Sequence, residues 1–235
     1  YKEKFDVNKA SSVSITIKNN LDHSIFLKNI KIYGQKVDQP FFKNNFVGVK
    51  FPLFSFQSKN KFLANRMLAM ISKNSEKKQL IEIHNRPYLI DIIAKANNFP
   101  VSMFFHNDPK TMKGSKSIFE REKLLEQCVA VFCVSKYVKN QFLNGIKHNH
   151  EKVFVLYNGV DRKLKEFPVK KKEILFVGRL VPEKGVDLYL DVVNSISNSF
   201  SDWTFSLIGS PRLGDELHTN SYANKVIKKF IKIGK

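Results

Sequence analysis

Four short apolar runs alternate with helix-like segments through the middle of the chain. The runs lack Gly and Pro, and they are Leu80–Ile83, Val101–Phe105, Val129–Val134 and Val153–Leu156. Strands that are apolar on both faces and alternate with helices are typical of a parallel sheet covered by helices on both sides. The pattern therefore predicts a doubly wound α/β domain.

Helical spacing and capping residues mark the segments between these strands. Apolar side chains near the i, i+4, i+7 template predict a helix over Lys61–Lys73, and Pro87 suits the first turn of the next one. Further helices are expected over Ile118–Gln127 and over Lys136–Leu143, where Ser135 can cap the N-terminus.

The N-terminal part of the chain has the residue types and alternation of strands. Its strand-like runs are Val13–Ile17, Ile25–Leu27, Ile30–Tyr33 and Val47–Phe51. We therefore expect the beginning of the chain to be rich in strands.

A lysine-dense segment interrupted by Pro168 reads as a linker and divides the chain into domains 1–168 and 169–235. The second part offers only two strands, Ile174–Val177 and Trp203–Ile208, with helices from Val186 and over Ser221–Ile233. Because this is too small for a doubly wound sheet, we expect the second domain to be truncated. The chain does not begin with Met, so we expect the first domain to lack its opening strand.

Ligands of doubly wound sheets bind outside the carboxyl ends of the strands, which directs attention to the loops that follow them. Four such loops carry polar groups: His84, Asn85 and Arg86; His106, Asn107 and Asp108; Asn158; and Gly178 with Arg179. For Asn158, which precedes Gly159, a purely structural left-handed turn is the favoured interpretation.

Two of these loops also have a structural alternative. Asn107 and Asp108 precede a proline and suit a turn through their own backbone hydrogen bonds. Arg86 equally suits an acceptor phosphate or an exposed ion pair with Glu82 or Asp91.

The segment Ile174–Leu190 combines a buried strand, a basic loop and the start of a helix. Gly178 lets the chain leave the sheet, Arg179 and Lys184 flank a short turn, and Gly185 closes it. The free amides at the start of the next helix and the positive end of its dipole favour an anion there. The spacing alone is equally consistent with two solvated charges.

The same loop reads G-R-L-x-x-x-K-G, which resembles the donor-site motif of glycosyltransferase family 4. Three further stretches resemble segments of that family: His84–Pro87, Phe104–Glu122 and Val153–Asp161. In the last of these, Tyr157 stands where the family commonly has proline. The resemblance extends over roughly residues 80–210.

Membership of this family implies a GT-B fold with two Rossmann-like domains, the second incomplete here. It implies a retaining hexosyltransferase that moves a sugar from a nucleoside-diphosphate sugar to a glycan or lipid-linked glycan. Arg179 and Lys184, with Gly178 and Gly185, would hold the donor diphosphate, and His106 would face the donor sugar without serving as an assigned general base. The residues expected near the acceptor or the interdomain cleft are His84, Asn85, Arg86, Asn107, Asp108 and Asn158.

The resemblance places the enzyme in bacterial cell-envelope polysaccharide or lipopolysaccharide synthesis, in the cytoplasm or peripherally at the inner face of the membrane. Two glutamates eight positions apart, which contact the donor in relatives, are absent from the chain. We therefore expect the fragment itself to bind and turn over a nucleotide sugar poorly.

The formal charge of +19 would ordinarily indicate a nucleic-acid or membrane partner. Most of the excess is scattered lysine, whereas the arginines preferred for bidentate recognition are few, so no nucleic acid is expected and anionic lipid is the better candidate. Two alternatives remain: a basic, non-catalytic α/β protein that binds nucleic acid or anionic membrane, and a GT-B sugar-nucleotide epimerase.

The remaining composition indicates a metal-free site in a reducing compartment. Cys128 and Cys133 lie within or beside an apolar run and are expected to be buried thiols. The six histidines are dispersed and no ligand spacing recurs, so neither a metal nor a cofactor is expected. No apolar run approaches the length of a membrane span.

Overall fold

The computed structural model describes residues 4–54, 56–71, 79–96, 99–162, 164–211 and 219–233. The chain divides into two compact units, the first running to Val160 and the second from Asp161, with the short segment Asn8–Ser12 grouped with the second. The boundary predicted near residue 168 and the division after Val160 both lie between strands β6 and β7, where the described residues form no helix or strand.

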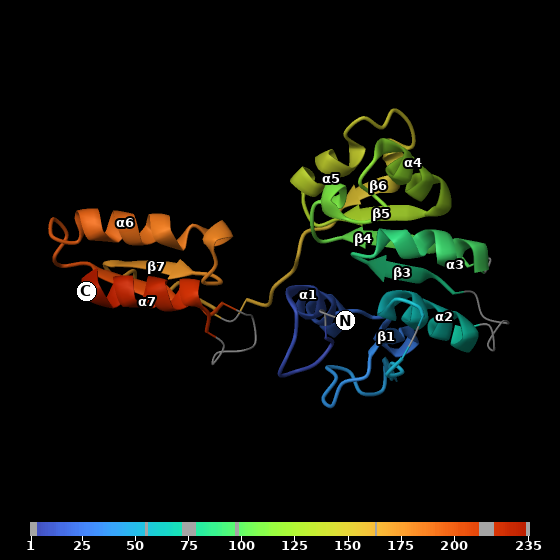
Figure 1. Cartoon of the computed structure of the whole chain (residues 1–235), viewed down its shortest axis with the longest axis horizontal. Coiled ribbons are helices and arrows are strands. Elements are labelled where there is room, and N and C mark those ends of the chain that lie inside the picture. The colour runs from blue at the N-terminus through green and yellow to red at the C-terminus, as the bar shows by residue number, and fades with distance from the viewer. Residues whose placement is uncertain are drawn as a thin grey trace. The chain divides into compact units, whose positions relative to one another are not determined.

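The first unit is built on a parallel sheet of four strands in the order β3-β4-β5-β6 (Figure 1). The strands are β3 (Ile81–His84), β4 (Val101–Phe105), β5 (Ala130–Cys133) and β6 (Val153–Val155). In the register, His84 lies beside Phe104 and Phe104 beside Phe132. All five residues of β4 are buried, as expected for a strand covered on both faces, whereas in β3 and β5 only alternate residues are buried.

The helices between these strands begin where their sequences favour it. After the 3-10 turn Pro87–Leu89 comes α3 (Ile90–Ala96), followed by α4 (Ile118–Gln127) and α5 (Lys136–Leu143). Ser117 and Glu120 form a reciprocal capping box at the start of α4. Ser135 accepts a hydrogen bond from the amide of Val138 at the start of α5, as predicted.

One continuous core joins the sheet to its helices, including α2 (Lys59–Ile71). Its fully buried members include Ile90, Met103, Phe105, Val131 and Phe142, and the aromatic rings of Phe105 and Phe142 lie 5.3 Å apart. Cys128 and Cys133 are free thiols in this core, and burial raises the pKa of each to about 12. The prediction of buried, unpaired cysteines is confirmed.

The prediction for the N-terminal residues was partly wrong. Val13–Ile17 lies in a helix, α1 (Ser12–Asp22), because burial selects one side of a helix, Val13, Ser14 and Thr16, instead of alternate residues. Ile25 is exposed, and the residues after it form the 3-10 turn Leu27–Asn29 instead of a strand. β-Branched residues favour strands only when packing supports that choice.

The other two N-terminal strands were predicted correctly. They are β1 (Ile32–Gln35) and β2 (Phe46–Val49), which pair in parallel as a separate two-stranded sheet. Tyr33 of β1 packs against the main core, and Phe5 stacks on Phe46 at a ring separation of 5.8 Å.

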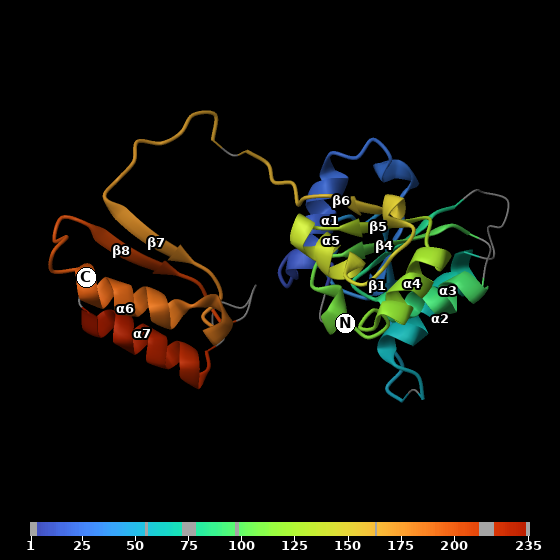
Figure 2. The same cartoon turned by 90° about the horizontal axis from the view of Figure 1, so that it is seen from above.

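The second unit consists of a parallel strand pair and two helices that lie on the same side of it (Figure 2). Its elements are β7 (Glu173–Val177), the 3-10 turn Pro182–Lys184, α6 (Val186–Ile196), β8 (Thr204–Ile208) and α7 (Ser221–Ile233). A small core holds them together through Leu180, Val186, Leu190, Ala223 and Val226. Within the described residues, no helix has the length and apolar character needed to cross a membrane.

Candidate functional site

Two histidines meet at the carboxyl ends of the neighbouring strands β3 and β4. His84 is the last residue of β3 and His106 follows β4, and their nitrogens His84 Nδ1 and His106 Nε2 lie 2.9 Å apart. Adjacent parallel strands end at the same edge of the sheet, so the two loops are brought together by the register. The sequence analysis named both residues but did not foresee that they bond to each other.

The ring of Phe104 packs against the imidazole rings of both histidines. Its ring stacks on His106 at a centroid separation of 4.4 Å and on His84 at 5.3 Å. Phe104 is only 2% exposed, so it is held in place by the sheet and cannot move away from the rings. Packing against the buried Phe104 therefore fixes the orientation of both histidine rings.

Asn85 joins the loop after β3 to the loop after β4 through hydrogen bonds. It has a positive φ of 51° and is buried, and its amide nitrogen donates to the carbonyl of Phe104. Its side chain accepts from the backbone N–H of His106 at 2.9 Å and donates to Oδ1 of Asn107 at 3.0 Å. Asn85 and Asn107 therefore serve the architecture of the loop pair.

Glu82 completes the cluster from within β3. Its Oε1 lies 2.9 Å from Nε2 of His84. Burial alone would raise the pKa of Glu82, but the hydrogen bond from His84 and the charges of His84 and His106 lower it. Sequence reasoning missed this role; the i, i+2 spacing of Glu82 and His84 on one strand face was the available signal.

His106 is held in its neutral form at ordinary pH. The pKa of His106 is lowered to about 4, mainly by burial and in addition by the charge of His84, while Glu82 acts in the opposite direction. A neutral imidazole has one donor and one acceptor nitrogen, so His106 can both give and take a hydrogen bond.

Arg86 contacts the backbone of its own loop. Arg86 donates to the carbonyl of Asn85 at 2.7 Å, while Glu82 is engaged by His84, and Asp91 by Lys95 and Lys123.

Asp108 takes part in a turn. Its side chain accepts from the amide of Lys110 at 2.9 Å and begins the 3-10 turn Pro109–Thr111. Asn158 is exposed in the segment after β6, and within the described residues no hydrogen bond joins it to His84 or His106. Hydrogen bonds thus join His84 to His106 and Asn85 to His106 and Asn107, whereas among the described residues none joins Asn158 to the two histidines.

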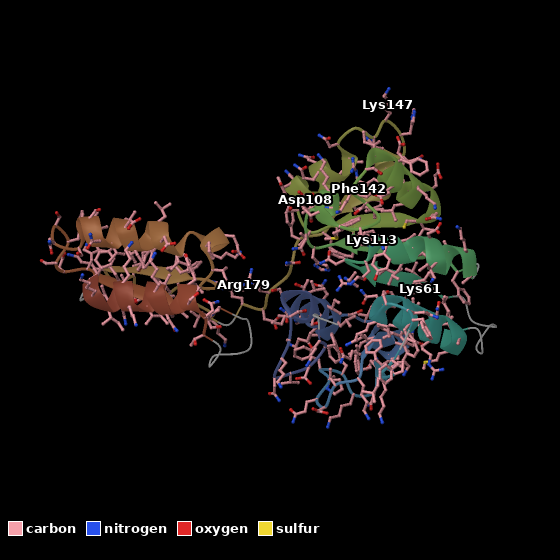
Figure 3. The ribbon with its side chains drawn as sticks, viewed as in Figure 1. Lys61, Asp108, Lys113, Phe142, Lys147 and Arg179 are labelled. Atoms are coloured by element: carbon pink, nitrogen blue, oxygen red, sulfur yellow. The ribbon has the colours of Figure 1, made fainter. Side chains whose placement is uncertain are left out.

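Arg121 supports the loop that follows His106. Its guanidinium is buried and donates to the carbonyls of Ser115 and Lys116 on one side and of Phe142 and Asn144 on the other. Figure 3 shows the region, with Asp108 and Phe142 labelled. The guanidinium uses four of its five N–H donors in these bonds, a planar arrangement that only arginine provides.

The basic loop of the second unit lies between β7 and α6. Gly185 has a φ of 71° and immediately precedes α6, whose first backbone hydrogen bond runs from Tyr189 to Gly185. The amides of the first helical turn are therefore free to bind an anion. The sequence analysis predicted this turn and this helix start.

The two cations of the loop are exposed. Arg179, labelled in Figure 3, is 47% exposed at its side chain and pairs with Glu183 at 3.3 Å. Lys184 ends the 3-10 turn, and among the described residues it has no ion-pair partner. The arrangement can bind an anion once Arg179 exchanges its weak surface pair for a stronger one.

Gly209 was missed by sequence reasoning. A Cβ at this position would lie 1.8 Å from the carbonyl oxygen of Gly178. The loops after β7 and β8 continue to pair here, since Gly178 donates to Ile208 and Leu180 donates to Ser210, each at 3.0 Å. The glycine directly after the strand Thr204–Ile208 was the available signal.

The described residues contain no group of three or more His, Cys, Asp and Glu side chains arranged to hold a metal ion. The second unit offers two cations and helix amides that can bind an anion, and the first unit offers imidazoles that can give and take hydrogen bonds.

The chain is similar to known glycosyltransferases in sequence and in fold. The sequence profile of Glycosyltransferase Family 4 matches residues 29–164, and that of Glycosyl transferases group 1 matches residues 159–235. A protein of Methanocaldococcus jannaschii, named as an uncharacterized glycosyltransferase, is 39% identical over 83 residues, which are 35% of this chain and 21% of that protein. YtcC of Bacillus subtilis, a glycosyltransferase by name, is 25% identical over 156 residues, which are 58% of this chain and 38% of that protein.

The chain thus spans well under half the length of these relatives. Among solved structures, Anabaena HepE in complex with UDP and glucose matches with a TM-score of 0.62 at 15% identity, over 97% of this chain and 65% of that one. HepE in complex with UDP-glucose matches with a TM-score of 0.56 at 14% identity, over 97% and 64%. With a profile match over more than half of its length and this likeness of fold, the chain belongs to glycosyltransferase family 4 and has the GT-B fold.

Proposed function

We propose that the protein is a retaining glycosyltransferase that moves a hexose from a nucleoside-diphosphate sugar to a hydroxyl of a glycan or lipid-linked glycan. The observation that carries the proposal is the loop of Gly178, Arg179, Lys184 and Gly185 at the start of α6, with exposed cations and free helix amides. It lies in the part matched by the group 1 profile, and HepE, a structural neighbour, binds UDP-glucose.

The reaction breaks the bond between the sugar and the diphosphate, so negative charge develops on the departing group. Arg179, Lys184 and the first amides of α6 stabilise that charge in a preformed site. Each such donor is worth about 3 kcal/mol in the transition state. The protein's own groups supply the positive charge in this proposal, and the nucleotide sugar is a substrate, with no further cofactor.

The histidine loops of the first unit serve the sugar and the acceptor. His106 offers a neutral imidazole, and Arg86, at the same edge of the sheet, offers a guanidinium for an acceptor phosphate. The acceptor class fits synthesis of bacterial cell-envelope polysaccharide or lipopolysaccharide on the cytoplasmic side of the membrane.

A direct test incubates the full-length protein with UDP- and GDP-hexoses, with and without lipid-linked glycan acceptors. We expect release of UDP or GDP that increases with acceptor, and a product whose anomeric configuration, read by NMR, matches that of the donor. Absence of nucleotide release from every donor would contradict the proposal. An altered free sugar nucleotide without transfer would indicate an epimerase instead.

Peripheral contact with anionic membrane is part of the proposal and rests on one loop of the first unit. Leu53, Phe54 and Phe56 are more than nine-tenths exposed, and Lys50 and Lys59 flank them in sequence. Apolar side chains can enter the lipid interface while lysines attract its negative charge.

Vesicle flotation tests this contact. We expect the protein to float with vesicles containing phosphatidylglycerol and much less with pure phosphatidylcholine. Phe54→Ser together with Phe56→Ser should reduce flotation, whereas Phe167→Ser, another exposed phenylalanine, should not. Equal flotation of all three proteins would remove this loop from the proposal.

A further inference from the structure

Glu82, His84 and His106 form a continuous hydrogen-bonded chain at the edge of the sheet. Glu82 Oε1 and His84 Nε2 are 2.9 Å apart, and His84 Nδ1 and His106 Nε2 are also 2.9 Å apart. Both nitrogens of His84 are therefore occupied within the protein. Among the ring nitrogens of this pair, His106 Nδ1 is the one that has no hydrogen bond to a described residue and can meet a substrate.

The chain has two consistent arrangements of protons. A carboxylate accepts, so His84 carries a proton on Nε2 in both. In the first arrangement His84 is neutral, and His106 donates its Nε2–H to His84 Nδ1, which leaves His106 Nδ1 as an acceptor. In the second, His84 is an imidazolium that donates Nδ1–H to His106 Nε2, and the neutral His106 carries its proton on Nδ1.

The two arrangements differ by one proton, and this difference defines a path. A proton taken up at His106 Nδ1 is matched by transfer of the bridging proton from His106 Nε2 to His84 Nδ1. The positive charge then rests on His84, beside the carboxylate of Glu82. Charge is thereby moved from His106 to an ion pair without any heavy atom changing place.

We propose that Glu82, His84 and His106 are a proton relay that accepts the hydroxyl proton of the sugar acceptor. His106 is the group that touches the substrate, and Glu82 and His84 are positioning residues that fix its tautomer and receive the charge. This inference rests on the glycosyltransferase function proposed above.

The transfer forms one bond, breaks one bond and moves one proton. The acceptor oxygen forms its bond to the sugar carbon, and the bond from that carbon to the diphosphate oxygen breaks with its electron pair going to the diphosphate. The hydroxyl proton passes to His106 Nδ1, and the bridging proton passes to His84. When the diphosphate leaves, the relay returns its proton to solvent or to the diphosphate.

Neighbouring residues hold the side chains of the relay in place. Phe104 fixes both rings from below, and Asn85 fixes the backbone of His106. The charged groups that act on His106 are His84 and Glu82 of β3, while Arg86 in the next loop is held on the carbonyl of Asn85. Burial and the charge of His84 keep the pKa of His106 low, which disfavours a positive charge on His106 itself when its Nδ1 takes up a proton.

The first test reads the proton positions in the chain itself, without any activity. Nitrogen-15 NMR of the imidazoles assigns the proton of each ring as the pH is lowered from 9 to 5. We expect His84 Nε2 to stay protonated throughout and the proton of His106 to move from Nε2 to Nδ1. A proton that stays on one nitrogen of His106 at every pH would overturn the relay.

Glu82→Gln keeps an oxygen acceptor for His84 but removes the charge. The pH at which the pair takes up its proton should then fall by about one unit. Glu126→Gln removes an exposed carboxylate of α4 and should leave the transition in place. An unchanged transition in Glu82→Gln would show that Glu82 does not receive the charge. If that variant does not fold, the proton positions in the unaltered chain still decide the question.

The second test uses turnover. In Glu82→Gln the acidic limb of the kcat profile should move to lower pH by the same amount, with little change in the KM for the donor. A merely structural role would lower kcat equally at all pH values, which would overturn the proposal. If the unaltered protein transfers no sugar at all, the proposed function fails, whereas the NMR result stands independently.

Discussion

The strand-end loops of the two units hold their polar groups in opposite ways. β4 is buried at all five residues, and the loops after β3 and β4 are tied together by Glu82, His84, Asn85 and His106. β7 is exposed at four of its five residues, and the cations that follow it lie in solvent. The loops of the first unit therefore hold their side chains in fixed positions, whereas the loop of the second unit presents exposed cations to an anion.

This difference separates stability from ligand binding. A group with several buried partners contributes to folding and to function together, because its removal leaves those partners unsatisfied. An exposed cation contributes little to folding, so its removal can change ligand binding alone.

Arg121→Met should have the largest effect on the first unit. It removes the donors to four carbonyls in a site that is 2% exposed, so the free energy of unfolding should fall by about 3 kcal/mol or more. Urea denaturation followed by circular dichroism measures this. Arg66→Met, on the exposed side of α2, is the matched control and should change it by less than about 0.5 kcal/mol.

Lys184→Ala should separate binding from folding in the second unit. We expect donor turnover to fall by about a hundredfold while the melting temperature stays the same, because the ammonium is exposed. Nucleotide release from the cognate donor measures the rate. Lys225→Ala removes an exposed lysine of α7 and should keep full turnover. Equal rates for both variants would remove Lys184 from the diphosphate site.

Gly209→Ala should show that the second unit, although its basic loop is exposed, has no room for a side chain at position 209. Its new Cβ would meet the carbonyl of Gly178 at 1.8 Å, so the paired loops must separate, at a cost of about 2 kcal/mol. Nucleotide binding by calorimetry should weaken with it. Gly159→Ala meets nothing within 4 Å and should leave both measurements unaltered.

The acid sensitivity of the first unit should depend on His106. Its pKa is about 4 in the folded protein against 6.5 for the ordinary group, so the unfolded chain takes up the proton first as the pH falls. Stability should be fully present above pH 6.5 and should fall by about 2 kcal/mol on the way to pH 4. Denaturation at pH 7 and 4.5 should show a smaller loss in His106→Gln, and parallel pH curves would contradict this.

Ser102→Ala should have the smallest effect. Its hydroxyl is buried on β4 without a hydrogen-bond partner among the described residues, so its loss should leave the stability the same or raise it by up to about 1 kcal/mol. Ser115→Ala is the opposite case, because its hydroxyl donates to Pro109 at 2.6 Å and its loss should cost about 1 kcal/mol. Thermal denaturation of both variants measures the contrast.

The elements after residue 59 were largely predictable from the sequence because local signals agree with packing there. The apolar runs form strands, and the serine caps of α4 and α5 and the glycine before α6 stand where those helices begin. Near the N-terminus the signals conflict, since the β-branched residues Val13, Ile15 and Thr16 favour a strand although burial is satisfied by a helix.

The candidate site divides in the same way. The basic loop was predictable because Gly178, Arg179, Lys184 and Gly185 are consecutive or nearly so, and one turn places them. The histidine cluster was only partly predictable, because Glu82 and His84 meet His106 through the pairing of two strands. Gly209 became meaningful only with the carbonyl of Gly178 beside it.

The sequence by itself therefore determined the alternation of strands and helices, the resemblance to a glycosyltransferase family and the short loop suited to a diphosphate. Each depends on periodicity or on residues that are close along the chain. The tertiary structure alone decided which side chain bonds to which: Glu82 to His84, His84 to His106 and Arg121 to the loop beneath them. Such contacts depend on register and burial, which arise only when distant segments pack together.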